Sequence, residues 1–125
     1  MNRKDIVNQW ISSFAPEVSD EILNEHVFNG GNFLWHVFTW GEIPCLCGDD
    51  ARKAFDELEY DSATVFYSGY SKNDYPVIKN VAVSKKISSE ELETMSDVYF
   101  VCQDFKWTYV HTHESSCGPY FRRVI

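Results

Sequence analysis

The sequence predicts an α+β fold in which helices pack on one face of a small, largely antiparallel sheet, as a single pair of layers. Three observations support this prediction. Apolar residues recur at helical spacing near the N-terminus, short apolar runs typical of strands follow, and short turn segments join the last of these runs. A parallel pair between the first two strands remains an alternative. We expect one domain, residues 1–125, because this length falls within the usual size of single domains.

Two helices are expected at the start of the chain. The apolar stripe of the first consists of Ile6, Val7, Trp10, Ile11 and Phe14. Pro16 ends that helix. Ser19 suits the N-cap of a second helix, and the run Asn29-Gly30-Gly31 ends it.

A buried central strand is predicted at 33–40, because this run is apolar on both alternating faces. The segment 41–48 is interpreted as a loop, with the Cys45-Leu46-Cys47 triplet inside it. Asp49 suits the cap of the next helix, whose opposite face is acidic. The apolar face of that helix consists of Ala51, Ala54, Phe55 and Leu58.

The second half of the chain predicts mainly strands. A short strand is expected at 63–67 and a polar, aromatic loop at 68–76, whereas 77–82 fits either a helical turn or a strand. Ser88 and Glu91 form a capping-box pattern for a short helix that reaches about residue 95.

An antiparallel hairpin is predicted near the C-terminal end. Its strands are 98–101 and 105–113, with Gln103-Asp104 between them. Gly118-Pro119 then turns the chain into a short extended piece, Tyr120-Phe121. Because strand side chains alternate, one face of the second strand should hold Trp107, Tyr109, His111 and His113.

Charge separates the chain into unequal parts. The net charge is −8, and residues 42–61 hold seven acidic side chains against two basic ones. A chain without a basic stripe is poorly suited to nucleic acid, because phosphate contacts require Lys and Arg. An acidic face instead suits a basic protein partner, although a solvated surface would explain the same charge.

The hydropathy pattern indicates the cellular compartment of the protein. No apolar run approaches the roughly 18 residues that a membrane-spanning helix requires, and the N-terminal segment lacks the apolar region of a signal peptide. We therefore expect a cytoplasmic protein without a membrane partner. Its four cysteines should be mostly reduced in that compartment.

The C-terminal hairpin carries the densest candidate chemistry. His111 or His113 could act as a general base, with Cys117 as nucleophile and Glu114 orienting the imidazole. The same two histidines and Cys117 are candidate zinc ligands, with Cys45 and Cys47 as further donors. His36 lies on the predicted central strand. If His36 approached His111 and His113, both the catalytic and the zinc-site hypothesis would be strengthened.

Structural roles explain the same residues. The cysteine spacing matches no standard zinc pattern, since only one residue separates Cys45 from Cys47. No recognised nucleophile motif surrounds Cys117. On this interpretation the histidines pack against aromatic rings and bond to nearby backbone. We therefore expect no cofactor and no bound metal, and binding is favoured over catalysis.

A protein-binding surface is the hypothesis that we favour over a metal or catalytic site. Acidic residues of the 49–59 helix and tyrosines of the 68–76 loop are its candidate residues, since exposed tyrosines bring large rigid area and a hydroxyl group. The candidate binding residues are Asp49, Asp50, Asp56, Glu57, Glu59, Tyr70 and Tyr75.

Two stretches resemble a known family. One is Phe33-Leu34-Trp35-His36-Val37-Phe38, with Cys45, Gly48, Ala51, Ala54 and Phe55 after it. The other runs from Asp97-Val98-Tyr99 through Phe105, Trp107-Thr108-Tyr109-Val110 and Thr112-His113-Glu114 to Cys117-Gly118-Pro119-Tyr120-Phe121. Together they resemble the bacterial domain-of-unknown-function family 4275, found largely in bacilli and their relatives. The resemblance implies a bacterial, cytoplasmic, single-domain protein and transfers no catalytic role.

These observations favour a small acidic, non-enzymatic protein-binding domain. One concrete form is an immunity-type protein that masks a basic toxin with residues 42–61. The alternative is a small metal-binding protein or hydrolase centred on the C-terminal hairpin.

Overall fold

The computed structural model describes residues 3–22, 37–38, 43–59, 63–67, 81–83, 87–93, 97–102, 104–112 and 118–124. The helices are α1 (Arg3–Phe14), α2 (Asp20–Ile22), α4 (Asp49–Glu57) and α5 (Ser89–Leu92). The strands are β1 (Leu46–Cys47), β2 (Ala63–Tyr67), β3 (Val81–Val83), β4 (Val98–Val101), β5 (Trp107–His111) and β6 (Tyr120–Arg123).

The strands form one six-stranded sheet in the order β1-β6-β5-β4-β2-β3. Every pairing of the described strands is antiparallel. The α+β prediction with a small antiparallel sheet is therefore confirmed. The register places one row of side chains across five strands: Leu46, Phe121, Tyr109, Phe100 and Val65.

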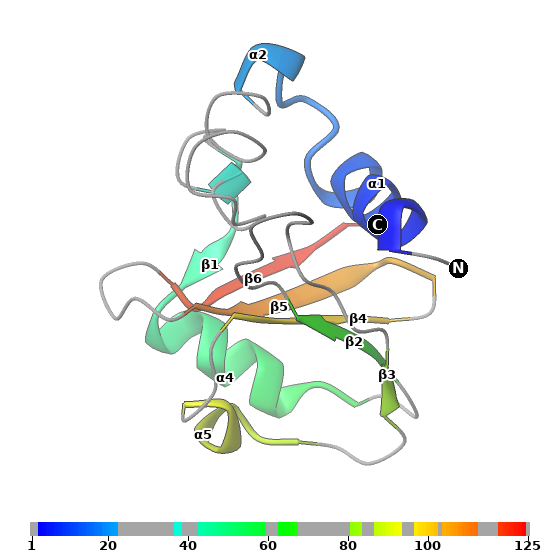
Figure 1. Cartoon of the computed structure of the whole chain (residues 1–125). Helices are drawn as coiled ribbons and strands as arrows, with labels where there is room; N and C mark the ends of the chain where they lie inside the picture. Colours follow the sequence, from blue (N-terminus) through cyan, green and yellow to red (C-terminus); the bar gives the residue numbers. More distant parts are fainter. Residues whose placement is uncertain are drawn as a thin grey trace.

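Helices cover both faces of this sheet, which differs from the predicted single pair of layers. Figure 1 shows α1 above the sheet, and α4 and α5 below it. The two buried clusters follow the strand alternation: Tyr99 and Val101 pack with α1, whereas Val98 and Phe100 pack with α4 and α5. Because β4 is apolar on both faces, a second helical layer is needed to cover it.

α1 packs through the stripe that the sequence predicted. Ile6, Trp10 and Phe14 are buried in the cluster on that face. The Trp10 indole N–H donates to the Thr108 hydroxyl oxygen over 2.9 Å, and this hydroxyl donates to the Phe100 carbonyl over 2.7 Å. A buried polar group costs stability unless it is bonded, so these two bonds define how α1 sits on the sheet.

The prediction of a strand at 33–40 is wrong where the structure describes it. Val37 and Phe38 are helical, although both are buried as expected. The Phe38 ring lies 5.7 Å from Trp10 and 5.0 Å from Tyr120, measured between ring centroids. A short apolar run is typical of a buried helix as well as of a strand, so periodicity alone does not separate them.

Other element boundaries also differ from the predictions. The segment expected as a loop at 41–48 contains β1, and the undecided segment at 77–82 contributes to β3. The second hairpin strand begins at Trp107, because Phe105 lies in the left-handed region with φ 55°. The capping box of Ser88 and Glu91 is confirmed, although the α5 helix ends at Leu92.

Within the described segments, none of the helices has both the length and the apolar character that crossing a bilayer requires.

The buried indole bond yields the first prediction. Thr108→Val leaves the Trp10 N–H without its acceptor, and we expect the free energy of unfolding to fall by about 1–3 kcal/mol. Urea denaturation measures the change. Thr64→Val, at a partly exposed position of β2, is the control and should stay within about 0.5 kcal/mol of wild type. Equal losses in the two variants would contradict a special role for the indole bond.

Tyr109 yields a second prediction, on pH dependence. Its hydroxyl oxygen is buried without a hydrogen-bond partner among the described residues, and burial raises the pKa of this phenol. The unfolded chain releases the phenolic proton near pH 10, whereas the folded protein keeps it. Stability from this group is therefore complete below pH 10 and is lost as the pH rises further.

Tyr109→Phe should remove that loss. We expect the variant to be at least as stable as wild type at pH 7, because the replaced hydroxyl is unsatisfied. Above pH 10 its unfolding midpoint in urea should fall less steeply than that of wild type. A variant that is less stable by more than about 1 kcal/mol at pH 7 would contradict the assignment.

Candidate functional site

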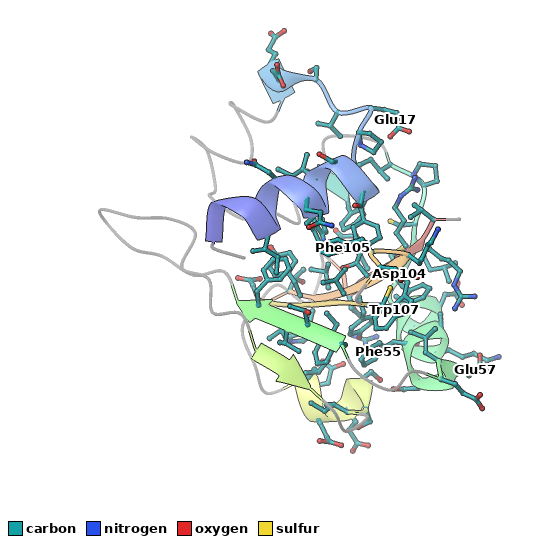
Figure 2. The ribbon with its side chains drawn as sticks, turned by 90° about the vertical axis from the view of Figure 1, so that its right-hand side faces the viewer. Glu17, Phe55, Glu57, Asp104, Phe105 and Trp107 are labelled. Carbon is teal, nitrogen blue, oxygen red and sulfur yellow. The ribbon has the colours of Figure 1, made fainter. Side chains whose placement is uncertain are left out.

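The α4 helix is positioned by one aromatic side chain. Phe55 stacks on Tyr109 with ring centroids 4.1 Å apart, and it also contacts Phe100 edge-on at 5.3 Å. Figure 2 shows Phe55 between α4 and the sheet, close to Trp107. Ala51, one turn earlier, is also buried. The opposite face of the helix is therefore turned to solvent with its acidic residues.

α4 begins directly after β1. Gly48 occupies the N-cap with φ 63°, a left-handed conformation that glycine adopts at little cost, and Asp49 is the first helical residue. The prediction of Asp49 as the cap is therefore off by one residue. This sharp turn sets β1 beside α4 at the edge of the sheet.

Two predicted acidic binding residues have partners inside the fold. Asp49 accepts a 2.7 Å bond from Arg52, whose Nε also donates to Glu93 at 2.7 Å. Both Arg52 bonds raise the pKa of its guanidinium, with the Glu93 bond as the larger cause. The Asp49 side chain is 98% exposed, so its pair contributes little to stability.

Asp56 holds the start of α5. One of its oxygens accepts from the Ser89 N–H and the other from the Ser89 hydroxyl, both at 2.7 Å. A carboxylate at a helix N-terminus accepts from otherwise unpaired N–H groups. The structure thus gives Asp56 a role in joining α4 to α5.

Two of the remaining acidic candidates, Glu57 and Glu59, line an open groove. Leu46, Ala54, Leu58 and Phe121 supply its apolar lining, and Glu57, Glu59 and Arg123 its charged lining. The groove has a volume of about 510 Å³ and lies between the second half of α4 and strands β1 and β6. Asp50, Ala54 and Glu57 share one helix face by their spacing. Leu46 is 44% exposed, and it is the one exposed large apolar side chain among the described residues.

A smaller depression of about 380 Å³ adjoins this groove. It shares Leu46, Phe121 and Arg123 with the groove and adds Cys45 from the preceding chain. Burial raises the pKa of the Cys45 thiol to about 11, with the neighbouring Cys47 as a smaller cause. Cys45 is therefore almost fully protonated at neutral pH, which makes it a poor nucleophile.

The predicted catalytic centre is described only in part. His111 ends β5 and is buried, on the same strand as Tyr109. The other members of that set, His113, Glu114 and Cys117, lie outside the described residues, as do His36, Tyr70 and Tyr75. Within the described part of the chain, no three His, Cys, Asp or Glu side chains are grouped to hold a metal ion.

The sequence did not single out the apolar part of the groove. Leu46 lies between two cysteines in a segment interpreted as a loop, and Phe121 and Arg123 come from the last strand. The short apolar run of Cys45, Leu46 and Cys47 next to Pro44 was the available signal for a short edge strand.

The fold and the groove can be compared with known proteins. The family model described as a domain of unknown function, DUF4275, matches residues 2–121. The match confirms the resemblance proposed from the two sequence stretches and extends it to the N-terminal helices. No curated protein and no solved structure shows significant similarity to the chain.

Asp56 yields the third prediction. Asp56→Ala removes both acceptors of Ser89, and we expect the free energy of unfolding to fall by about 1.5–3 kcal/mol. Glu57→Ala is the matched control on the same helix, and it should change stability by less than about 0.5 kcal/mol. Urea denaturation of both variants tests the assignment, which would be wrong if the two losses were equal.

Proposed function

The chain belongs to the DUF4275 family, and for this member we propose the function of a non-enzymatic protein-binding domain. Its binding surface is the exposed side of α4 together with the groove beside β1, and its partner is a basic protein. The immunity-type form of this proposal is that the surface masks a basic toxin.

One observation carries the proposal. Asp50, Glu57 and Glu59 are exposed and have no ion pair among the described residues, whereas Asp49 pairs with Arg52 and Asp56 accepts hydrogen bonds from Ser89. Lys53 is the exposed basic side chain between Asp50 and Glu57 on the helix. An excess of carboxylates without an ion pair near an apolar groove is typical of a recognition surface, since charge steers the approach and apolar area holds the complex.

The charge distribution adds support. Residues 42–61 carry a net charge of −5, whereas residues 62–125 hold equal numbers of acidic and basic side chains. A local excess of one sign raises the association rate with a partner of the opposite sign. The effect weakens with added salt, because the Debye length shortens to about 8 Å at physiological ionic strength.

Neutralising the three unpaired acids tests the proposal and is the fourth prediction. A partner captured from the source cells is identified, purified and titrated with wild type and with the triple variant Asp50→Asn, Glu57→Gln, Glu59→Gln. We expect a basic partner and an affinity about tenfold weaker for the variant, from three exposed charge pairs of up to about 1 kcal/mol each. The salt dependence of binding should also be shallower for the variant.

The matched control carries the same change in charge elsewhere. Glu17, Asp20 and Glu21 are exposed near α2, and Figure 2 shows Glu17 far from Glu57. Their triple Gln/Asn variant should bind within about twofold of wild type. Unchanged affinity and salt dependence in the α4 variant would refute the proposal, and so would equal losses in the two variants. In the immunity-type form, a stoichiometric amount of wild type also abolishes the toxic activity of the partner.

A further inference from the structure

We propose that the groove beside β1 receives an extended segment of the partner, with alternating apolar and basic side chains, that adds to the sheet as a strand along the free edge of β1. The inference rests on the proposed function, because it states how that partner is held. It specifies which side chains the partner segment carries and that the segment binds as an added strand, neither of which follows from the acidic surface alone.

The outer edge of β1, called its free edge below, has no paired strand among the described residues. β1 is the last described strand on its side of the sheet. The Gly48 N–H donates to the Pro119 carbonyl over 3.0 Å, and Leu46 stands opposite Phe121. In an antiparallel ladder the bonded residues alternate, so the Cys47 N–H and C=O point away from β6. None of the described strands pairs with these two groups, and their direction suits pairing with a further strand.

The groove supplies a place for an apolar side chain. Leu46 points to the same face of the sheet as Phe121, and Ala54 of α4 and Leu58 just after the helix close the groove from the other side. An added strand presents every second side chain to this face. One such side chain can lie against Leu46 and cover its exposed surface, which is the usual anchor of an added strand.

The charges of the groove select a basic segment. Glu57 and Glu59 stand on the α4 side, and Arg123 on the β6 side is the one basic residue of the described lining. A strand beside β1 lies on the side of β1 opposite to β6, and the surrounding 42–61 region is strongly acidic. Lysine or arginine in the segment would therefore meet unpaired carboxylates.

The ends of β1 limit the length of pairing. Pro44 has no N–H group, and its carbonyl accepts from the Arg122 guanidinium. Gly48 turns the chain into α4 at the other end. The free edge therefore spans about two residues, so most of the selectivity must come from the groove and the carboxylates rather than from a long ladder.

Synthetic peptides test the inference on the full chain. The probes are acetylated, amidated eight-residue peptides in which leucine alternates with lysine, and matched peptides in which leucine alternates with glutamate. Two further leucine–lysine series carry N-methyl groups on either the odd or the even amides. Binding is measured by calorimetry and by amide shifts of β1 and α4 in nuclear magnetic resonance spectra.

The expected result has three parts. The leucine–lysine peptide binds, the leucine–glutamate peptide binds at least tenfold more weakly, and only one of the two N-methylated series loses binding. Leu46→Ser should weaken binding about tenfold, because it removes the apolar anchor. Ile87→Ser, at a partly buried apolar side chain outside the groove lining, is the control and should bind as wild type does. Unfolding curves of both variants establish that each is folded.

Several outcomes would overturn the inference. Binding that survives both N-methylated series, or that Leu46→Ser leaves unchanged, excludes an added strand at this groove. Equal binding of the lysine and glutamate peptides excludes selection of a basic segment. A dimer in sedimentation that Leu46→Ser abolishes would make a second copy of the chain the occupant. No peptide binding, while the Asp50/Glu57/Glu59 variant still loses its partner, refutes this inference and leaves the proposed function standing.

Discussion

The burial of β4 and β5 on both faces is the constraint on which the rest of the structure depends. Every residue of these two strands is buried. A strand without a polar face must be covered on both sides, since exposed apolar area is unfavourable in water. α1 covers one side with a tryptophan bonded to Thr108, and α4 covers the other with a phenylalanine stacked on Tyr109. The three layers of Figure 1 follow from this requirement.

The candidate site follows from how the second layer is attached. Phe55 fixes α4 over the middle of the sheet, and Asp56 ties the helix to α5. Those two anchors use one side of the helix, so Asp50 and Glu57 remain turned to solvent. Because β1 is short and Gly48 turns sharply into α4, the end of the sheet is not fully covered by the helix, and the groove at Leu46 results.

Local patterns predicted the elements that depend on local interactions. The α1 stripe, the strand at 63–67, the first hairpin strand and the capping box of Ser88 all have sequence signals within a few residues, and each is present. The strand prediction for 33–40 was wrong at Val37 and Phe38, because a short apolar run suits a buried helix as well as a strand. The loop prediction for 41–48 was wrong only at Leu46 and Cys47, which form a strand through pairing with distant Phe121 and Tyr120. Burial of Val37 and Phe38 was predicted correctly, since burial depends on hydrophobicity and not on element type.

The fold class, the family and the acidic character of residues 42–61 could all be predicted before the structure was known. This was possible because composition, periodicity and charge are properties of the chain. Which acidic side chains make contacts within the fold depends on long-range packing: Asp56 bonds to Ser89, 33 residues away, whereas Glu57 beside it lines the groove. The groove lies between α4 and two strands, β1 and β6, which are the first and the last described strands of the chain. Contacts between such distant segments leave no local signal in the sequence.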